Sequence, residues 1–188
     1  MNGNLAYQEE LWKEKLNGQV VLMSPRPSVN HNRVAGNIYH TFRNYLKGKT
    51  CETFGDGVDV FLTEDDNVIP DAMIVCNKNI IQPDGIHGAP DLVVEVLSPS
   101  TVKNDRGYKK DLYEAVGVKE YWIVDPSICS VETYLLRDGR YVLDGYYGLF
   151  PDNLSITDLE RKESKKEMSV SLYNDFSISL EEIFHNLF

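Results

Sequence analysis

The sequence predicts an α/β fold of the α+β kind, with a central mixed β-sheet flanked by helices. Some segments have apolar residues at every second position, as in strands, and others have apolar residues at helical spacing. Their order along the chain is helix, strands, helix, strands. Residues 92–97 form a nearly continuous apolar run, which is typical of a strand buried on both sheet faces. A length of 188 residues suits one domain and can bury a core, so we expect residues 1–188 to form a single domain.

The first half of the chain is expected to contain two helices and two strands. A turn signal, Asn17-Gly18, closes the first helical pattern, and Ser28 is a good N-cap for the second, which Gly48 ends. Alternating valines and leucine predict a half-buried strand before the acidic turn at 64–67. The predicted elements are a helix at 5–16, a strand at 20–23, a helix from Ser28 to Gly48 and a strand at 57–62.

The second half is predicted to be richer in strands. Gly117 marks the end of a helix, Asp138-Gly139 is a strong hairpin signal, and Ser179 with Glu182 forms a capping box. A charged stretch at 160–167 is expected to be a solvated turn. The predicted elements are strands at 71–75, 92–97 and 120–124, a helix at 105–116, paired strands at 131–136 and 140–147, and a final helix ending at Phe188.

Composition and charge restrict the possible functions. The net charge is −10 and the pI is near 4.8, which argues against a tight, non-specific DNA binder, because such proteins need a basic face. It leaves room for an enzyme that uses cations at one site. Residues 1–14 do not resemble a signal peptide and the apolar runs are too short to cross a bilayer. We therefore expect a cytoplasmic protein that is not associated with membranes.

The cysteines are few and widely spaced. Cys51, Cys76 and Cys129 are odd in number and include no Cys-x-x-Cys pair, so neither a zinc ribbon nor a disulfide framework is expected. Cys76 and Cys129 lie beside strand-like sequence and are interpreted as small core residues in a reducing compartment.

Glu95 is the most unusual residue of the sequence. It lies inside the apolar run at 92–97, where a carboxylate is unfavourable unless a partner or metal ion compensates for its charge. The alternative is structural: Glu95 reaches solvent at a strand end or pairs with an arginine. Asp71, which follows Pro70 and opens another strand, is the natural partner, although Pro-Asp can also simply begin a strand or turn. Two carboxylates on neighbouring strands suit a hard cation such as Mg²⁺.

A cation is the third element of this hypothesis. Asp105, Lys109 and Tyr113 are spaced four residues apart and so share one helix face. Lys109 could point to the carboxylates and stabilise the charge that develops on a phosphate. The alternative is a surface pair between Asp105 and Lys109, worth a few tenths of a kcal/mol. Lys110 is adjacent and remains a second candidate.

These segments resemble the Uma-type restriction endonucleases. The similarity is dense from Pro70 to Pro126: it covers Pro70-Asp71, the run from Pro90 to Thr101, the spaced Asp105, Lys109 and Tyr113, and the segment from Gly117 to Pro126. It is looser upstream, at Glu14, Asn17-Gly18 and His31, and again in the closing segment 180–188. The family belongs to the restriction-endonuclease-like superfamily, whose signature is PD-(D/E)xK.

The resemblance implies a Mg²⁺-dependent phosphodiesterase site, with Mn²⁺ as a substitute, that acts on DNA. Asp71 and Glu95 would be metal ligands together with the Val96 carbonyl, and Glu14 would lie near the metal. Two positions depart from the pattern: Leu97 replaces the lysine two residues after the acid, which implies that Lys109 has taken its place, and Asn17 replaces an acid. His31 is kept as a site neighbour, although a histidine on a helix is more often structural.

Three functions follow from the sequence. The first is a metal-dependent endonuclease acting on DNA. The second is a catalytically inactive nuclease-fold protein that serves as an interaction module, which the acidic charge and the missing lysine favour. The third is a two-carboxylate glycoside hydrolase, which would retain activity in a chelator. The hairpin at 131–147 could expose an edge, which suggests a homodimer.

Overall fold

The computed structural model describes residues 13–22, 27–149 and 166–187. Its main element is a six-stranded mixed sheet in which β9 and β10 are parallel and the other neighbours are antiparallel. In spatial order the strands are β12 (Arg140–Gly148), β11 (Ser130–Arg137), β10 (Glu120–Asp125), β9 (Leu92–Val96), β6 (Ala72–Val75) and β3 (Glu52–Gly55). The predicted central mixed sheet is therefore present.

A second, smaller sheet packs beside the first. It contains short strands in the order β2 (Gln19–Leu22), β1 (Lys13–Leu16), β5 (Asn67–Val68), β4 (Val60–Phe61), β8 (Gly85–His87) and β7 (Ile81–Gln82), with a 3-10 turn, η1, at Lys78–Ile80. Leu16, Val60, Val68 and Ile86 of this sheet are buried in one core cluster with residues of the central sheet.

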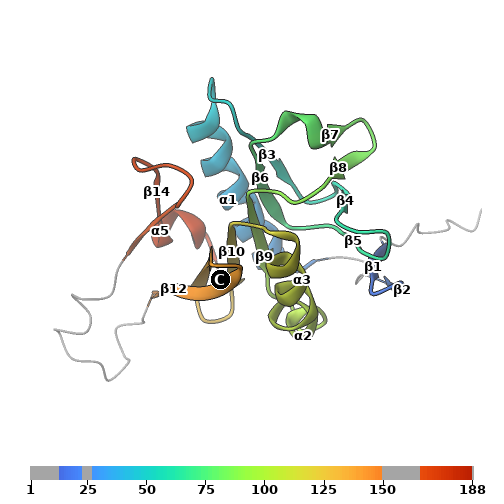
Figure 1. Ribbon diagram of the computed structural model, residues 1–188. Helices are drawn as coiled ribbons and strands as arrows, with labels where there is room; N and C mark the ends of the chain where they lie inside the picture. The colour runs from blue at the N-terminus through green and yellow to red at the C-terminus, as the bar shows by residue number, and fades with distance from the viewer. Residues whose placement is uncertain (1–12, 23–26, 150–165, 188) are drawn as a thin grey trace, which may run out of the picture.

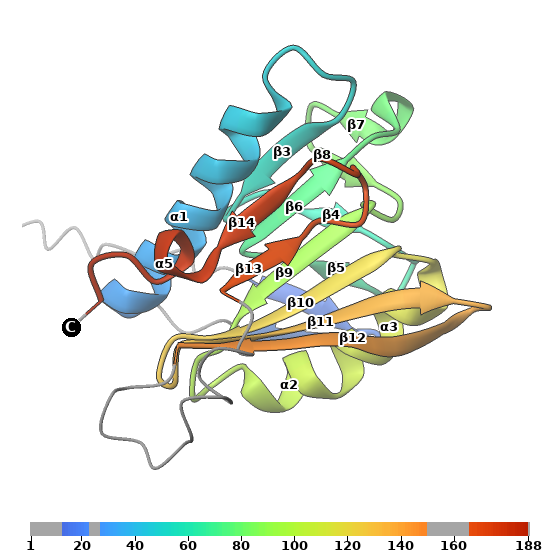
Figure 2. The same ribbon diagram turned by 90° about the vertical axis from the view of Figure 1, so that its left-hand side faces the viewer.

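Helices cover both faces of the central sheet. In Figure 1 the sheet is seen nearly edge-on, with α1 (Val29–Leu46) and α5 (Leu180–Ile183) on one side and α2 (Val102–Arg106) and α3 (Tyr108–Val116) on the other. Figure 2 shows the hairpin of β13 (Glu167–Ser169) and β14 (Ser177–Ser179) on the same side as α1. The predicted arrangement of sheet and flanking helices is confirmed, with the small sheet as an additional layer over the α3 face.

Strand alternation divides the core into two clusters. On β9, Leu92, Val94 and Val96 face α1 and α5, whereas Val93 faces α3 and the small sheet. Glu95 is on the same side as Val93 because successive side chains of a strand point to opposite faces. The carboxylate is therefore directed to the layer that holds α3.

Several predicted boundaries are confirmed by local geometry. Ser28 caps α1, with its Oγ accepting a hydrogen bond from the His31 backbone N–H at 3.1 Å. Gly117 ends α3 in the left-handed conformation at φ 89°, and the hairpin turns at Asp138-Gly139. The capping box of Ser179 and Glu182 is present at α5. Phe188 and most of the charged stretch at 160–167 lie outside the described residues.

Three element predictions are wrong in part. Residues 13–16 form β1, not the end of a helix, because Asn17-Gly18 makes a hairpin turn with both residues at positive φ; residues 5–12 lie outside the described part. The strand at 57–62 is reduced to β4, while β3 at 52–55 was not predicted. The helix at 105–116 is two helices, α2 and α3, which meet at Gly107.

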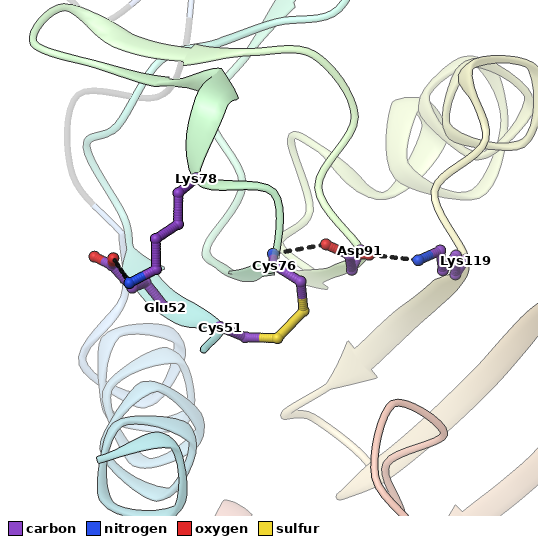
Figure 3. The surroundings of a disulfide bond; sticks show 6 residues. All are labelled: Cys51, Glu52, Cys76, Lys78, Asp91 and Lys119. Atoms are coloured by element: carbon purple, nitrogen blue, oxygen red, sulfur yellow. Dashed lines mark hydrogen bonds and ion pairs between the residues drawn. A yellow bond between two sulfur atoms is a disulfide. The ribbon is translucent and has the colours of Figure 1, made fainter. Parts of the chain in front are cut away.

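The cysteine prediction also needs correction. Cys51 and Cys76 are joined by a disulfide bond, shown in Figure 3, whereas Cys129 is free. Antiparallel pairing of Glu52 with Val75 sets the two cysteines opposite each other at the ends of β3 and β6. A pairing across 25 positions depends on strand register, which the spacing of cysteines does not reveal.

The surroundings of the disulfide contain two further links. The Cys76 backbone N–H donates to Asp91 Oδ2 at 2.7 Å, and Lys119 Nζ lies 2.7 Å from the other oxygen of the same carboxylate (Figure 3). Asp91 thus connects the end of β6 to the residue that precedes β10.

Two further expectations concern the surface. Among the described residues, no helix is long and apolar enough to span a membrane. The strand β12 lies at the edge of the central sheet and carries exposed Val142, Leu143 and Tyr146. The homodimer through this edge stays a prediction.

Candidate active site

Glu95 lies at the centre of the candidate site. It belongs to β9, and its side chain is buried against α3. Its Oε1 accepts a hydrogen bond from the Tyr113 hydroxyl at 2.6 Å and lies 3.1 Å from Lys109 Nζ. The alternatives in which Glu95 reaches solvent or pairs with an arginine are therefore wrong for the described residues.

Lys109 is the cation that meets this carboxylate. It is only 1% exposed, and its ammonium forms ion pairs with Glu14 at 2.7 Å, Glu95 at 3.1 Å and Asp105 at 3.6 Å. The pair with Asp105 is buried, so its interpretation as a surface pair is wrong. Lys110 points elsewhere, with its Nζ 3.8 Å from the centre of the Tyr134 ring. The geometry therefore places Lys109, and not Lys110, among the carboxylates.

Glu14 reaches the site from β1 of the small sheet. The strand pairs with β5, with Lys15 opposite Asn67, and this register brings Glu14 close to the segment that leads to Asp71. Glu14 Oε1 accepts a hydrogen bond from the Ile69 backbone N–H at 2.9 Å. The residue predicted to lie near the site does so, but from a strand and not from a first helix.

Asp71 lies beside Glu95 because of strand register. β6 is antiparallel to β9, with Ala72 opposite Val94, so continuing the register by one residue sets Asp71 opposite Glu95. Asp71 Oδ2 accepts a hydrogen bond from the Val96 backbone N–H at 2.7 Å. The two carboxylates predicted from separate motifs are therefore neighbours, and their charges interact.

His31 extends the site to the first turn of α1. Its Nε2 lies 3.4 Å from Asp71 Oδ1, and its Nδ1 is buried without a hydrogen-bond partner among the described residues. Burial acts to lower the pKa of His31, but the hydrogen bond and charge of Asp71 and the Val96 backbone outweigh burial and raise it. His31 can therefore balance part of the charge of Asp71.

Two acidic residues of the site were not predicted as functional. Asp105, a buried carboxylate, approaches Lys109 from α2, and Asp56 follows β3 near His31 and Asp71. Burial and the charge of Asp71 raise the pKa of Asp56. The helical spacing of Asp105 with Lys109 was a usable signal, whereas Asp56 depends on the pairing of β3 with β6, which no local pattern indicates.

The electrostatics show an excess of negative charge. Burial raises the pKa of Glu95 well above its usual value, and Lys109 opposes this shift while Asp105, Asp71 and Glu14 add to it. Burial also acts to lower the pKa of Lys109, but the carboxylates of Glu95, Glu14 and Asp105 outweigh it and raise the pKa, which keeps the ammonium charged. Among the described residues, three carboxylates pair with Lys109, and the charge of Asp71 adds a fourth acid beside Glu95.

This charge imbalance is the observation that fits a metal ion. Asp71 and Glu95 offer carboxylate oxygens side by side, and Mg²⁺ commonly binds through one or two carboxylates while it keeps several waters. In the described part of the chain no three or more His, Cys, Asp or Glu side chains are grouped closely enough to hold a metal alone. A cation here would therefore depend on water and the Val96 carbonyl as well as on the two acids.

Comparisons with known proteins agree with this fold. Residues 5–164 match the family model "Uma2: Putative restriction endonuclease". An uncharacterized protein of Synechocystis sp. (strain ATCC 27184 / PCC 6803 / Kazusa) is 30% identical over 144 residues, which cover 73% of this chain and 75% of the relative.

A solved structure gives the same result for the fold. The crystal structure of "a putative nuclease belonging to DUF820" from Anabaena variabilis ATCC 29413 superposes with a TM-score of 0.67 at 16% identity, over 92% of this chain and 89% of the other. At this identity the similarity shows the fold alone. The family match covers most of the sequence, including every residue of the site described above, and the chain therefore belongs to the Uma2 family.

Proposed function

We propose that this protein is a Mg²⁺-dependent endonuclease that hydrolyses phosphodiester bonds of DNA, with Mn²⁺ as a substitute metal. The observation that carries the proposal is the convergence of Asp71, Glu95 and Lys109 in a buried cluster with more carboxylates than cations. Membership of a family whose model is described as "Putative restriction endonuclease" supports the same activity.

The metal ion would be held by Asp71 and Glu95, with the Val96 carbonyl and water. A metal bound there lowers the pKa of a bound water and polarises the phosphate. Lys109 contributes a fixed positive charge near Glu95, since three carboxylates hold its ammonium. Glu14 and Tyr113 orient the lysine and Glu95, and His31 orients Asp71.

The acidic surface is compatible with this activity. A net charge of −10 repels a DNA backbone, so affinity must come from local contacts and from the metal rather than from the overall field. We expect short-lived complexes whose affinity depends on salt concentration less steeply than that of a basic DNA-binding protein, because few phosphates are neutralised and salt screens the repulsion.

A nicking assay tests the proposal. Supercoiled plasmid is incubated with the wild type, Glu95→Ala, Lys109→Ala and the matched control Lys110→Ala, with Mg²⁺ or Mn²⁺ and with a chelator. We expect nicking by the wild type and by Lys110→Ala, and none by Glu95→Ala, by Lys109→Ala or in the chelator. If folded wild type leaves plasmid, single-stranded and branched DNA uncut with both metals, the nuclease assignment is abandoned. Cleavage of glycosides in a chelator would favour the glycoside hydrolase.

The alternative function is an inactive nuclease fold that serves as an interaction module. It is favoured by Leu97 in place of the usual lysine and by the ion pairs that already engage Lys109. A Mn²⁺ titration separates the two functions: an active site binds Mn²⁺ in the wild type and loses it in Glu95→Ala, whereas an inactive fold binds none in either.

A further inference from the structure

The helix α1 lies in a part of the chain that carries no acidic residue. Between Glu14 and Glu52 the sequence has no Asp or Glu, although the whole chain has 29 acidic residues and a net charge of −10. The first turn of α1 therefore supplies no carboxylate of its own to balance the positive end of the helix dipole. In Figures 1 and 2 the helix lies on the outside of the molecule, beside β3. This acidic chain thus places an acid-free helix at its surface.

The exposed face of α1 carries amides, basic side chains and one glycine. From Asn32 to Lys47, the C-cap, the exposed residues recur at steps of three or four, so they form one stripe along the helix. At a rise of 1.5 Å per residue the stripe is about 22 Å long. Its members, which we call the α1 stripe, are Asn32, Gly36, His40, Arg43, Asn44 and Lys47.

The two permanent cations of the α1 stripe are not neutralised by an ion pair. Arg43 donates a hydrogen bond to the Tyr39 hydroxyl at 3.0 Å, and in the described part of the chain neither Arg43 nor Lys47 pairs with an acid. Exposed cations of other elements do form ion pairs, for example Lys78–Glu52, Arg137–Asp144 and Arg140–Glu114. The α1 stripe therefore differs from the rest of the described surface in its uncompensated positive charge.

Acids on the elements around α1 have partners of their own. Asp175 accepts a hydrogen bond from the Tyr45 hydroxyl at 2.5 Å, and Glu181 lies 3.4 Å from Lys166 Nζ. Neither of these bonds involves the α1 stripe.

Gly36 is the member of the stripe that folding does not explain. Glycine is less favourable than alanine inside a helix, and a Cβ at this position would meet no atom within 4 Å. Its φ is not positive, so neither packing nor backbone conformation requires glycine here. Glycine also permits the close approach of a ligand to the backbone. A partner that lies directly against this face of the helix accounts for the residue.

The α1 stripe begins at the less buried end of the candidate active site. The Lys109 and Glu95 side chains are 2% and 4% exposed, whereas those of His31 and Asp71 are each 12% exposed. His31 precedes the first stripe residue, and its Nε2 lies 3.4 Å from Asp71 Oδ1. A substrate that reaches Asp71 from solvent therefore meets the first turn of α1.

We propose that the α1 stripe binds the phosphodiester backbone of the DNA substrate. Arg43 and Lys47 pair with phosphates, the asparagines and His40 donate hydrogen bonds to phosphate oxygens, and Gly36 lets the strand lie close to the helix. Contacts of this kind position DNA without reading its sequence. The inference rests on the proposed function for the identity of the substrate as DNA.

The size of the stripe fits a small, local contact. A length of about 22 Å corresponds to about six base pairs at 3.4 Å for each. Two neutralised phosphates give a slope of about −1.8 for the logarithm of affinity against the logarithm of salt concentration. This is a shallow dependence, and it suits a chain whose overall charge repels DNA.

The test is the binding of a fluorescent duplex, measured by anisotropy in a chelator so that metal makes no contribution. The double variant Arg43→Gln/Lys47→Gln is compared with the wild type and with Arg137→Gln/Arg140→Gln, which removes the same charge from β12 at the other edge of the sheet. We expect about tenfold weaker binding and a salt slope smaller by about 2 in the stripe variant, and affinity within about twofold in the control. Equal weakening in both variants, or wild-type affinity in the stripe variant, overturns the proposal.

Gly36→Leu provides a second measurement that a purely structural role would not produce. Because the position is open and leucine favours helices, we expect a higher melting temperature than that of the wild type together with weaker duplex binding. A more stable variant that binds the duplex as the wild type does contradicts the proposal.

Plasmid nicking with Mg²⁺ separates this inference from the proposed function. The stripe variant Arg43→Gln/Lys47→Gln should raise KM about tenfold and leave kcat within about twofold, because it removes binding that the ground state and transition state share. If the wild type binds duplex through the α1 stripe but cuts no DNA with either metal, the nuclease assignment fails and the α1 stripe stands. If the wild type nicks DNA and the stripe variant binds and nicks equally well, the nuclease assignment stands and the α1 stripe fails.

Discussion

Two buried glutamates on adjacent strands of the central sheet differ in their partners. Glu120 of β10 faces the α1 side, where it accepts hydrogen bonds from Trp122 Nε1 at 2.7 Å, the Ser171 backbone N–H at 2.8 Å and Ser171 Oγ at 2.5 Å. Glu95 of β9 faces the α3 side and meets a lysine, a tyrosine and three further carboxylates.

The difference shows which property of a buried acid indicates function. Burial raises the pKa of both groups, so burial alone does not distinguish them. At Glu120 the hydrogen bonds from Ser171 and Trp122 counteract the shift, whereas at Glu95 neighbouring carboxylates increase it. A buried carboxylate whose oxygens accept hydrogen bonds from neutral donors is typical of a structural link. A buried carboxylate that shares one cation with several other acids is typical of a catalytic or metal-binding site.

The largest expected effect comes from removing the charge of Glu95. We predict that Glu95→Gln lowers nicking activity by at least about 10²-fold, comparable to the removal of one preorganised electrostatic group, and eliminates Mn²⁺ binding. Initial nicking rates and calorimetry measure the two effects. The matched change Glu120→Gln should leave Mn²⁺ affinity unchanged; if it weakens binding as much as Glu95→Gln does, the contrast between the two acids is wrong.

The next effect is on stability and concerns Glu120. Glu120→Ala leaves the buried Trp122 Nε1–H without an acceptor, at about 1–3 kcal/mol, whereas the exposed Ser171 can donate to water instead. We predict a decrease in the free energy of unfolding of about 2 kcal/mol, measured by urea denaturation. Nicking activity per folded molecule should stay within about twofold of the wild type. A stable variant without activity would show that Glu120 belongs to the site.

The pH dependence of stability sharpens the comparison further. Burial raises the pKa of Glu120 in the folded state, so the protonated carboxyl group stabilises the fold. This stabilisation is complete at pH values below the pKa of the unfolded state, near 4.5, and is lost as the pH rises through the pKa of the folded state. A difference of one between the folded and unfolded pKa corresponds to about 1.4 kcal/mol. We predict that the stability difference between wild type and Glu120→Gln changes in favour of the variant as pH rises above 4.5. Denaturation curves from pH 4 to pH 8 test this, and parallel pH profiles would contradict it.

The smallest predicted effect lies on the apolar side, away from the acids. Ser179→Ala removes the Oγ that accepts a hydrogen bond from the Glu182 backbone N–H and so removes the side-chain cap of α5, at about 1 kcal/mol. We predict a decrease of about this size in the free energy of unfolding and unchanged Mn²⁺ affinity. A change in Mn²⁺ affinity would mean that the α1 face and the α3 face are coupled.

The sequence alone determined the elements that depend on local chemistry. Ser28 and Gly117 delimit helices, Asp138-Gly139 forms a hairpin, and the apolar run around Glu95 is the buried strand β9. Caps, turns and side-chain periodicity act over a few residues, so the order of residues is enough to predict them. Asp71, Glu95 and Lys109 could be named for the same reason, together with a resemblance carried by contiguous motifs.

Only the tertiary structure decided how separate segments meet. Strand pairing and register decide the strand at 13–16, the pairing of Cys51 with Cys76 and the position of Asp56. The packing of α2 and α3 against the sheet brings the carboxylates to Lys109. The disulfide joins residues that are 25 positions apart in the sequence, and the ion pair of Glu14 with Lys109 joins residues that are 95 positions apart. Their free energy comes from burying elements together, which no local pattern encodes.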